Sequence, residues 1–239
     1  MSKRINDGTY WDAHDLLTRN GMFNYAIGGR GTGKTYDAKY KRIKHFIKTG
    51  NQFIYLRRYK SEFEDKSEFF TDVVDNFPAW EFKVEGMKGC MRKQPIGDEK
   101  PGKWRTVCFF ITLANALSKK SVPYPNVDMI IFDEFIIDKG NVHYMSNEVK
   151  QFQDFYNTVD RFQDRVRVLF LANAVALTNP YFIWYHLKPR KGRRFISAAN
   201  GYHIVEMVQS EKFKRHVDNT RFGQMIKGTS YYEIGRAHV

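Results

Sequence analysis

Residues Gly28 to Thr35 read GGRGTGKT and satisfy the phosphate-binding pattern GxxxxGK followed by Ser or Thr. An apolar run at 22–27 precedes the pattern and helical spacing of apolar residues at 35–47 follows it, so it is predicted to lie between a strand and a helix. There, backbone N–H groups turn towards a phosphate, and the helix presents its positive end to the same anion. The bare pattern is expected by chance in roughly one per cent of chains of this length. The chain is therefore predicted to be a P-loop nucleotide-binding protein of the α/β class.

Further apolar runs supply the strands of a central, mostly parallel sheet flanked by helices. A chain of 239 residues is long enough for one large domain, which we expect over residues 1–208, followed by a basic, helix-like tail. Strands are predicted at 52–56, 106–113, 127–132, 166–172 and 202–208, helices at 61–77 and 148–162, and hairpins and loops at 80–105.

The glycine-rich loop is expected to supply both the phosphate cradle and the cofactor contacts. Lys34 would neutralise the β- and γ-phosphates of ATP, and the Thr35 hydroxyl would bind Mg²⁺. The remaining nucleotide contacts are expected from the same loop, at Gly28, Gly29, Arg30, Gly31, Thr32 and Gly33.

Two acids, Asp133 and Glu134, follow the apolar run VDMIIF, where a parallel sheet would place them beside the phosphate loop. Asp133 fits a partner of Mg²⁺, and Glu134 fits a base that orients and polarises the attacking water. The structural alternative is a helix N-cap with an acid in the first turn, which is common after strands. With the phosphate loop present, the catalytic interpretation is favoured. Because Glu134 would activate water, the pattern also favours ATP hydrolysis over phosphoryl transfer to a small molecule.

Other polar residues near predicted strand ends keep two interpretations. Asn173, which ends the run LFLAN, fits a sensor of the γ-phosphate and a turn residue equally well. Arg161, Arg165 and Arg167 are candidates for an arginine that reaches a neighbouring subunit's γ-phosphate, although for any one of them a solvated or acid-paired side chain is favoured. The same ambiguity holds for Lys119 and Lys120. Arg57 and Arg58 could couple strand ends to phosphate or DNA, or could equally be surface charges.

Aromatic residues make up 16% of the composition, which is typical of a well-packed core. Trp104 and the aromatic residues of FYNTVDRF at 155–162 are expected in that core, because apolar neighbours surround them. The alternative, that these rings stack on nucleic-acid bases, is disfavoured.

Charge and cysteine content narrow the possible partners. The chain has 39 Lys and Arg against 26 Asp and Glu, a formal net charge of +13. This surplus attracts polyanions, so nucleic acid is the natural partner, with a merely soluble basic protein as the equal alternative. Cys90 and Cys108 lack CxxC spacing, so neither a disulfide framework nor a zinc site is expected. No apolar run reaches membrane-spanning length, so we expect a soluble protein of a reducing cytosol without a membrane partner.

The chain resembles the DNA-encapsidation ATPases of small tailed phages with protein-primed genomes, which are relatives of the terminase large subunits. The resemblance runs from about Gly21 to Tyr232 and is carried, in order, by GGRGTGKT, QFIYLRRYK, YPNVDMIIFDEF, DRVRVLFLANAV with NPYF, and TRFGQMIKGT. It implies a P-loop fold of the additional-strand, catalytic-glutamate class. It also implies a homo-oligomeric ring, a pentamer in the family, that pumps double-stranded DNA into a procapsid. A phage portal and a packaging RNA are the other implied partners, and the implied location is the host cell cytoplasm, transiently at the procapsid vertex.

The resemblance also assigns roles to single residues. The loop lysine and threonine and the two acids match the family's nucleotide loop and its metal-holding and catalytic acids. Arg161 aligns with the family's trans-acting arginine, which lifts it above Arg165 and Arg167. Lys120 aligns with a second basic residue proposed at the subunit contact, with Lys119 as the alternative after a one-residue shift.

Family members continue into a second, nuclease-like domain. Residues 209–232 are therefore expected to begin the linker to such a domain, which this chain lacks. Residues 233–239, EIGRAHV, read like a translated sequencing adapter and are expected to be non-native.

Three other functions remain open on the sequence. A P-loop ATPase of the helicase-loader or phage-assembly type, which acts on single-stranded DNA or protein, would use the same loop and acids. A small-molecule kinase would transfer the phosphoryl group, and a nucleotide-binding switch would hold ATP without turnover.

Overall fold

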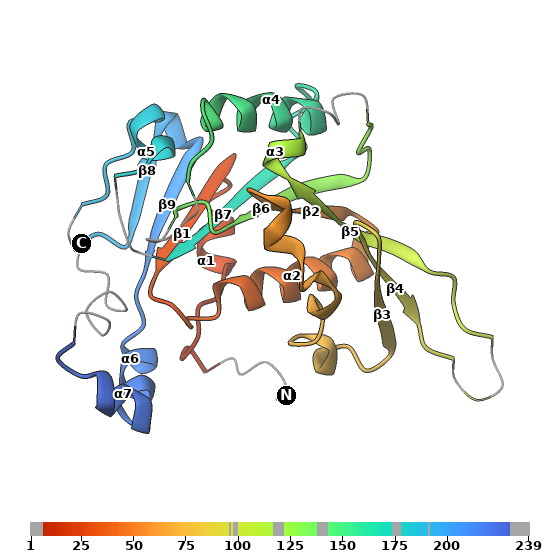
Figure 1. Ribbon diagram of the computed structural model, residues 1–239, viewed down its shortest axis with the longest axis horizontal. Coiled ribbons are helices and arrows are strands. Elements are labelled where there is room, and N and C mark those ends of the chain that lie inside the picture. The colour runs from red at the N-terminus through yellow and green to blue at the C-terminus, as the bar shows by residue number, and fades with distance from the viewer. Residues whose placement is uncertain are drawn as a thin grey trace.

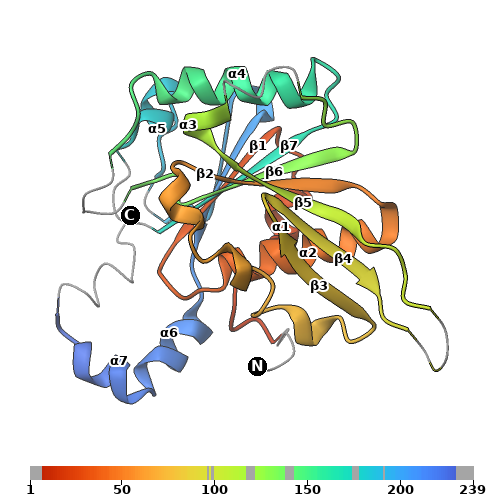
Figure 2. The ribbon, with the colours of Figure 1, turned by 45° about the vertical axis from the view of Figure 1, so that its right-hand side comes forward.

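A nine-stranded sheet forms the centre of the molecule within the residues that the computed structural model describes, which are 7–95, 97, 100–116, 122–137, 143–173, 178–190 and 192–229. The strand order is β3-β4-β5-β2-β6-β7-β1-β9-β8, and helices cover both faces (Figures 1 and 2). None of the helices in these ranges is long and apolar enough to cross a membrane.

The central strands are parallel, and their ends define two edges of the sheet. They are β5 (Arg105–Thr112), β2 (Gln52–Arg57), β6 (Val127–Asp133), β7 (Arg167–Asn173), β1 (Phe23–Gly28) and β9 (His203–Val208). We call the edge where Gly28, Asp133 and Asn173 end their strands the phosphate-loop edge, and the edge where these strands begin the opposite edge. Strand β7 lies between β1 and β6, so one additional strand separates the phosphate loop from the acid pair.

Shorter antiparallel strands complete both sides of the sheet. A hairpin of β3 (Trp80–Glu85) and β4 (Lys88–Lys93) joins β5, and β8 (Phe195–Ala198) pairs with β9.

Helices pack on the two faces and form two cores. One face carries α1 (His14–Leu17), α2 (Lys34–Thr49) and three 3₁₀ turns, Lys60–Phe63, Lys66–Glu68 and Val74–Asn76. The other face carries α3 (Leu113–Ala116), α4 (Glu148–Asp160) and α5 (Pro180–Trp184). After a 3₁₀ turn at Ala199–Gly201 and strand β9, the helices α6 (Glu211–Asp218) and α7 (Arg221–Ile226) extend away from the sheet (Figure 1).

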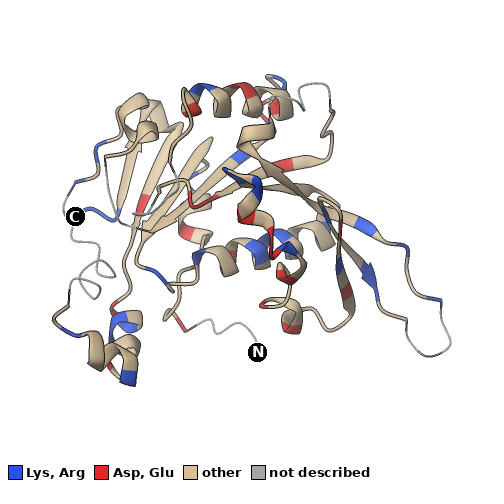
Figure 3. Cartoon of the chain, in the orientation of Figure 1, with Lys and Arg blue, Asp and Glu red and all other residues tan. Residues whose placement is uncertain are grey.

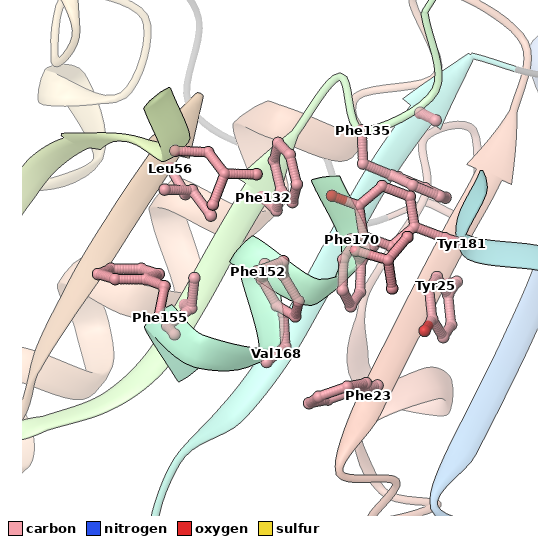
Figure 4. Packing of buried hydrophobic residues seen from close by; sticks show 14 of the residues in the cluster. Phe23, Tyr25, Leu56, Phe132, Phe135, Phe152, Phe155, Val168, Phe170 and Tyr181 are labelled. Atoms are coloured by element: carbon pink, nitrogen blue, oxygen red, sulfur yellow. The ribbon is translucent and has the colours of Figure 1, made fainter. Parts of the chain in front are cut away.

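Aromatic side chains fix α4 against the sheet (Figure 4). Phe152 and Phe155 are buried on one side of α4, and Phe152 lies 5.0 Å, between ring centroids, from Phe170 of β7. Phe170 in turn stacks on Tyr25 of β1 at 4.5 Å. Burial of each ring contributes about 2 kcal/mol of stability. Helix α4, which runs from the phosphate-loop edge to the opposite edge, is therefore held firmly against the sheet.

The strands predicted from the sequence are confirmed to within a residue or two, but the helix predicted at 61–77 is wrong. Three 3₁₀ turns occupy that segment instead. Phe63, Phe70 and Phe77 are all buried there against the sheet, although their spacing of seven residues would also place them on one side of a continuous helix. Tertiary packing therefore overrides local helix propensity.

Two aromatic residues expected in the core lie elsewhere. Trp104 is half-buried beneath two cations, with Lys83 Nζ at 4.7 Å and Arg92 Cζ at 4.6 Å from its ring centroid. Phe162 is 89% exposed, because it belongs to the turn after α4 and points away from the apolar side of that helix. Phe155 is buried as expected.

Candidate nucleotide site

The glycine-rich loop connects β1 to α2 through backbone that favours glycine. Gly31 and Gly33 have φ of 79° and 86°, in the left-handed region that side chains rarely adopt. At Gly28 the constraint is space, since a Cβ there would lie 2.6 Å from Cβ of Val208 on β9. The loop is held from outside by the backbone N–H of Trp11, which donates to the Thr32 carbonyl at 2.9 Å.

Lys34 bends back over this loop. Its ammonium donates to the carbonyl oxygens of Gly28 at 3.1 Å and Gly29 at 2.8 Å, and to the Thr32 hydroxyl at 3.1 Å. Burial lowers the pKa of Lys34 to about 8, although the negative charge of Asp133 acts in the opposite direction. An ammonium held only by neutral oxygens would bind an anionic phosphate more strongly than these groups, so the side chain is ready to exchange partners.

Asp133 joins the acid pair to the loop. Its Oδ2 accepts a hydrogen bond from the Thr35 hydroxyl at 3.0 Å and another from the hydroxyl of Tyr55 on β2. Burial raises the pKa of Tyr55 well above its usual value, and the neighbouring Asp133 charge raises it further, so the phenol remains a donor. Two hydroxyl donors thus orient a buried carboxylate towards the loop.

Glu134 differs from Asp133 in exposure and in backbone. Its side chain is 51% exposed, and its φ of 56° lies in the left-handed region, which costs a non-glycine residue about 1 kcal/mol. Arg57 Nη2 forms an ion pair with Glu134 Oε2 at 2.7 Å, while Arg57 Nη1 is 3.8 Å from Asp133 Oδ2. Burial lowers the pKa of Arg57, but the carboxylates of Asp133 and Glu134 and the Tyr55 phenol outweigh it and raise the pKa overall.

Arg58 supports the acid pair from behind. Its guanidinium is buried, donates to the carbonyl oxygens of Glu134 at 3.2 Å and Phe135 at 2.8 Å, and forms two bonds with Glu148 at 2.7 and 2.8 Å. Tyr181 on α5 donates to the same Glu148 carboxylate at 2.9 Å. These bonds tie the strained peptide of Glu134 to the first turn of α4, so Arg58 is neither a surface charge nor a phosphate contact.

A cavity of about 280 Å³ collects the predicted residues of the phosphate-loop edge. Asn173 belongs to it, because the register of β1 and β7 pairs Gly28 with Asn173 at the strand ends. The lining consists of Arg30, Gly31, Thr32, Gly33, Lys34, Thr35, Tyr36, Asp133, Glu134, Ala172 and Asn173. A larger hollow of about 790 Å³ beside β4 and β5 contains none of the loop residues, so the smaller cavity is the candidate nucleotide site.

The donor set in this cavity fits a magnesium ion bound together with phosphates. The Thr35 hydroxyl and the Asp133 carboxylate already meet at 3.0 Å, and oxygen ligands of this type are those that Mg²⁺ prefers. Mg²⁺ is usually held by one or two protein oxygens plus substrate phosphates, so two protein donors are sufficient.

Arg161 lies at the opposite edge, away from this cavity. Within the described residues its exposed side chain has no hydrogen-bond or ion-pair partner. Arg165 instead donates to the carbonyl oxygens of Tyr124 at 3.1 Å, Val127 and Val159, and Arg167 pairs with Asp164 at 2.9 Å. In the part of the chain that the structure describes, Arg161 is the one candidate arginine whose side chain has no such partner.

Lys119 and Lys120 lie outside the described residues, as do residues 233–239. The predicted role of Lys120 therefore stays a prediction.

Sequence reasoning missed Tyr55, which it counted only as a strand residue, and left Arg57 and Arg58 undecided. The available signal was position: Tyr55 and Arg57 lie at the end of β2 and Arg58 directly follows it, next to the strand β6 that leads into the acid pair. The pairing of Leu56 with Phe132 brings the end of β2 beside Asp133.

Comparison with known proteins gives a consistent picture. Residues 5–237 match the family described as podovirus DNA encapsidation protein (Gp16). The DNA packaging protein of Bacillus phage PZA is 39% identical over 242 residues, which cover 98% of this chain and 69% of that protein. The DNA packaging protein of Bacillus phage phi29 is 39% identical over 230 residues, covering 96% of this chain and 65% of that protein. The chain thus spans about two thirds of the length of these relatives.

Solved structures agree with the fold. The N-terminal domain of the DNA packaging ATPase from bacteriophage phi29 has a TM-score of 0.74 at 38% identity, covering 85% of this chain and 98% of that one. The large terminase ATPase domain of Thermus phage P74-26 has a TM-score of 0.57 at 14% identity, covering 96% of this chain and 92% of that one, and supports the fold alone. The predicted α/β P-loop fold is confirmed.

Proposed function

This chain belongs to the podovirus DNA encapsidation protein family, and we propose that it is the ATP-hydrolysing subunit of a ring motor that moves double-stranded DNA into a viral procapsid. Its relatives are named DNA packaging proteins, and a similar solved structure is named a packaging ATPase domain. The proposal covers residues 1–208 as the ATPase domain, since β9 ends at Val208, and α6 and α7 as the start of a linker. The host cell cytoplasm is the proposed location of the protein.

One observation carries the ATPase proposal: the hydrogen bond of 3.0 Å between the Thr35 hydroxyl and Asp133 Oδ2. It joins the phosphate loop to the acid pair across 98 residues of sequence. A phosphate cradle alone would fit many nucleotide-binding proteins, whereas a cradle joined to a carboxylate that is followed by a half-exposed glutamate fits hydrolysis.

In the proposed mechanism each residue has one task. Lys34 would leave its loop carbonyls and bind the β- and γ-phosphates, and Thr35 and Asp133 would hold Mg²⁺. Bound Mg²⁺ supplies neutralisation of phosphate charge. Glu134 accepts a hydrogen bond from the attacking water and orients it towards the γ-phosphate. Asn173, which lines the cavity, is the proposed γ-phosphate sensor.

The ion pair between Arg57 and Glu134 competes with this task. At 2.7 Å it occupies Oε2, one of the two carboxylate oxygens, and holds the side chain in place. We expect Glu134 to leave Arg57 during turnover, since its half-exposed side chain has room to do so. Arg57 remains held by Glu62, to which its Nε donates at 3.2 Å.

Arg161 is the proposed trans-acting arginine. Its turn contacts the start of β6 through Arg165, whereas the acid pair lies at the end of that strand. Six residue steps of strand separate the two places by about 20 Å, so Arg161 cannot serve its own nucleotide. A ring in which it serves the neighbour's nucleotide explains both its position and its free side chain. Lys120 is proposed at the same subunit contact on the resemblance alone.

The basic surplus supports duplex DNA as the cargo. Lys and Arg are spread over α2, the β3–β4 hairpin and α6 to α7 (Figure 3), which suits contacts to many phosphates and not the reading of one sequence. Affinity for random duplexes should therefore fall steeply as salt rises. A portal and a packaging RNA are further proposed partners.

DNA-stimulated phosphate release tests the proposal. Purified protein is mixed with ATP and Mg²⁺, and free phosphate is measured with duplex DNA, single-stranded DNA of the same length, or no DNA. We expect the largest stimulation from duplex DNA, decreasing with salt. Stronger stimulation by single strands would favour a helicase-loader type of ATPase. A phosphorylated small molecule without free phosphate would identify a kinase, and binding without any release would identify a switch.

A further inference from the structure

The turn after α4 exposes an aromatic ring beside an uncommitted cation. Phe162 is 89% exposed, more than any other large apolar side chain in the described ranges, and it directly follows Arg161. A single exposed Phe loses the stabilisation of about 2 kcal/mol that burial would give. Sequence reasoning expected this ring in the core, so its exposure needs an explanation.

The backbone of this turn is fixed in a costly conformation. Arg161 and Phe162 have φ of 54° and 56°, in the left-handed region that a bulky side chain rarely adopts. The buried carboxylate of Asp160 holds the turn by accepting backbone N–H bonds at 2.9 to 3.1 Å. The donors are Gln163, Asp164, Arg165 and Val166. The ring and the cation are therefore presented rigidly.

The structure behind the turn adds to this rigidity. Arg165 is anchored to the carbonyl oxygens of Val127 and Val159, and α4 is packed along the sheet by Phe152 and Phe155. A contact surface that is already ordered loses little conformational entropy when it docks. An exposed ring on a mobile loop would have no such advantage.

We propose that Phe162 is an apolar anchor that docks on a second copy of this chain and thereby delivers Arg161 to that copy's nucleotide site. The inference rests on the proposed function, because it takes the neighbour's phosphates as the target of Arg161. The partner is a second copy because Arg161 needs an anionic target, and the phosphate-loop edge of that copy supplies one in its bound phosphates and in the half-exposed Glu134 once this side chain leaves Arg57. Within one chain the two edges are about a strand length, roughly 20 Å, apart and cannot meet.

The contact is heterologous, since the opposite edge of one copy meets the phosphate-loop edge of the next. Contacts of this kind close into rings when the rotation between copies allows it. An aromatic anchor next to an arginine is also the combination in which binding energy concentrates at interfaces. Phe162 would determine the affinity of the contact between copies, and Arg161 would stabilise the phosphate charge in the neighbour's nucleotide site.

Two variants separate these roles. Phe162→Asn removes the ring, and because Asn tolerates the left-handed region, the turn should keep its shape. Met225→Ala is the control, since Met225 is 69% exposed on α7, away from the turn. Self-association is measured by sedimentation velocity over a range of protein concentrations, with Mg²⁺ and a non-hydrolysable ATP analogue. Phosphate release is measured over the same concentrations, and thermal unfolding confirms the fold of each variant.

We expect Phe162→Asn to raise the midpoint concentration of association by about 30-fold, with phosphate release per molecule restored at high protein concentration. Met225→Ala should leave the midpoint unchanged. An unchanged midpoint for Phe162→Asn would overturn the proposal, as would a wild-type protein that does not associate at any concentration. Sedimentation reads association without turnover, so a chain that associates through Phe162 but does not hydrolyse ATP would refute the proposed function and leave the anchor intact.

Discussion

Charged side chains have different roles at the two edges of the parallel sheet. At the phosphate-loop edge, Lys34, Asp133 and Glu134 line a cavity, and each has a partner that it could exchange, for phosphate, Mg²⁺ and water respectively. At the opposite edge, Asp160 and Arg165 use every contact to fix a turn. Hydrogen bonds and ion pairs that can be exchanged are typical of a ligand-binding site. Those that fix a turn hold the exposed side chains of that turn in place.

Under the proposed function the two edges act on different molecules. Residues at the phosphate-loop edge would act on the nucleotide of their own chain, whereas Arg161 and Phe162 would act on a neighbour. Hydrolysis would then depend on the contact between copies, as a ring motor requires if its subunits are to work in sequence.

Loss of the glutamate carboxylate should have the largest effect. Glu134→Gln removes the group that orients water, so we expect phosphate release to fall by at least about 100-fold while ATP binding is retained. Phosphate release and fluorescent-nucleotide binding are the measurements. Glu62→Gln is the matched control, because Glu62 contacts the same Arg57 but lies outside the cavity lining. Equal release from wild type and Glu134→Gln would reduce the phosphate-loop edge to a binding switch.

Two arginines of the opposite edge should fail in different ways. Arg161→Ala should reduce phosphate release by about 100-fold or more, as loss of an arginine finger does, with no change in unfolding free energy. Arg165→Ala leaves buried carbonyl oxygens without a donor and should cost about 2 kcal/mol of unfolding free energy. Denaturant unfolding and phosphate release are measured on both variants. If Arg161→Ala unfolds more easily than the wild type and Arg165→Ala does not, the assignment of turnover to Arg161 and of stability to Arg165 is contradicted.

The sequence predicts more of the candidate site at the phosphate-loop edge than at the opposite edge. The phosphate loop, Asp133 and Glu134 were predictable, because a loop pattern and a strand end are local signals, and strand ends of a parallel sheet meet at one edge. Arg161 was separated from Arg165 and Arg167 only by family resemblance, since hydrogen bonds to carbonyl oxygens of Tyr124 and Val127 depend on tertiary packing.

Sequence reasoning failed where a residue's role depends on its neighbours. The ring of Phe162 was expected in the core because local sequence cannot show that α4 ends at Asp160 and that the next residues turn outwards. Tyr55 was invisible as a functional residue, because a tyrosine in a buried strand is typical of core packing, and its contact with Asp133 spans 78 residues. The segment 61–77 was misassigned for the same reason.

A smaller effect is expected when one hydroxyl behind the acid pair is removed. Tyr55→Phe deletes a hydrogen bond to Asp133, and loss of such a supporting bond costs about tenfold in metal affinity. The Mg²⁺ concentration that half-saturates nucleotide binding should rise accordingly, as measured by fluorescence titration. Tyr25→Phe is the control, since the Tyr25 hydroxyl is also buried but bonds to His203 at 3.0 Å. An equal shift in both variants would indicate a general loss of stability.

The smallest expected effect is a pH dependence that belongs to the opposite edge alone. Burial lowers the pKa of His203, at the start of β9, to about 4. The unfolded chain therefore binds the proton more tightly, so stability falls as pH drops through the unfolded pKa. Between pH 7 and pH 6 the loss should be roughly 0.7 kcal/mol. Denaturant unfolding at both pH values would show it, and His203→Gln should remove it. An unchanged pH dependence in His203→Gln would place the titrating group elsewhere.

Mixing two inactive variants tests most directly the claim that the two edges work in different molecules. Glu134→Gln keeps Arg161, and Arg161→Ala keeps a complete phosphate-loop edge, so a mixed contact between them contains one intact site. In equal mixture, with random assembly, roughly a quarter of the contacts would be intact. Phosphate release should then rise well above that of either variant alone. Release that stays at the sum of the two separate variants would contradict the account, because both residues would then be needed within a single chain.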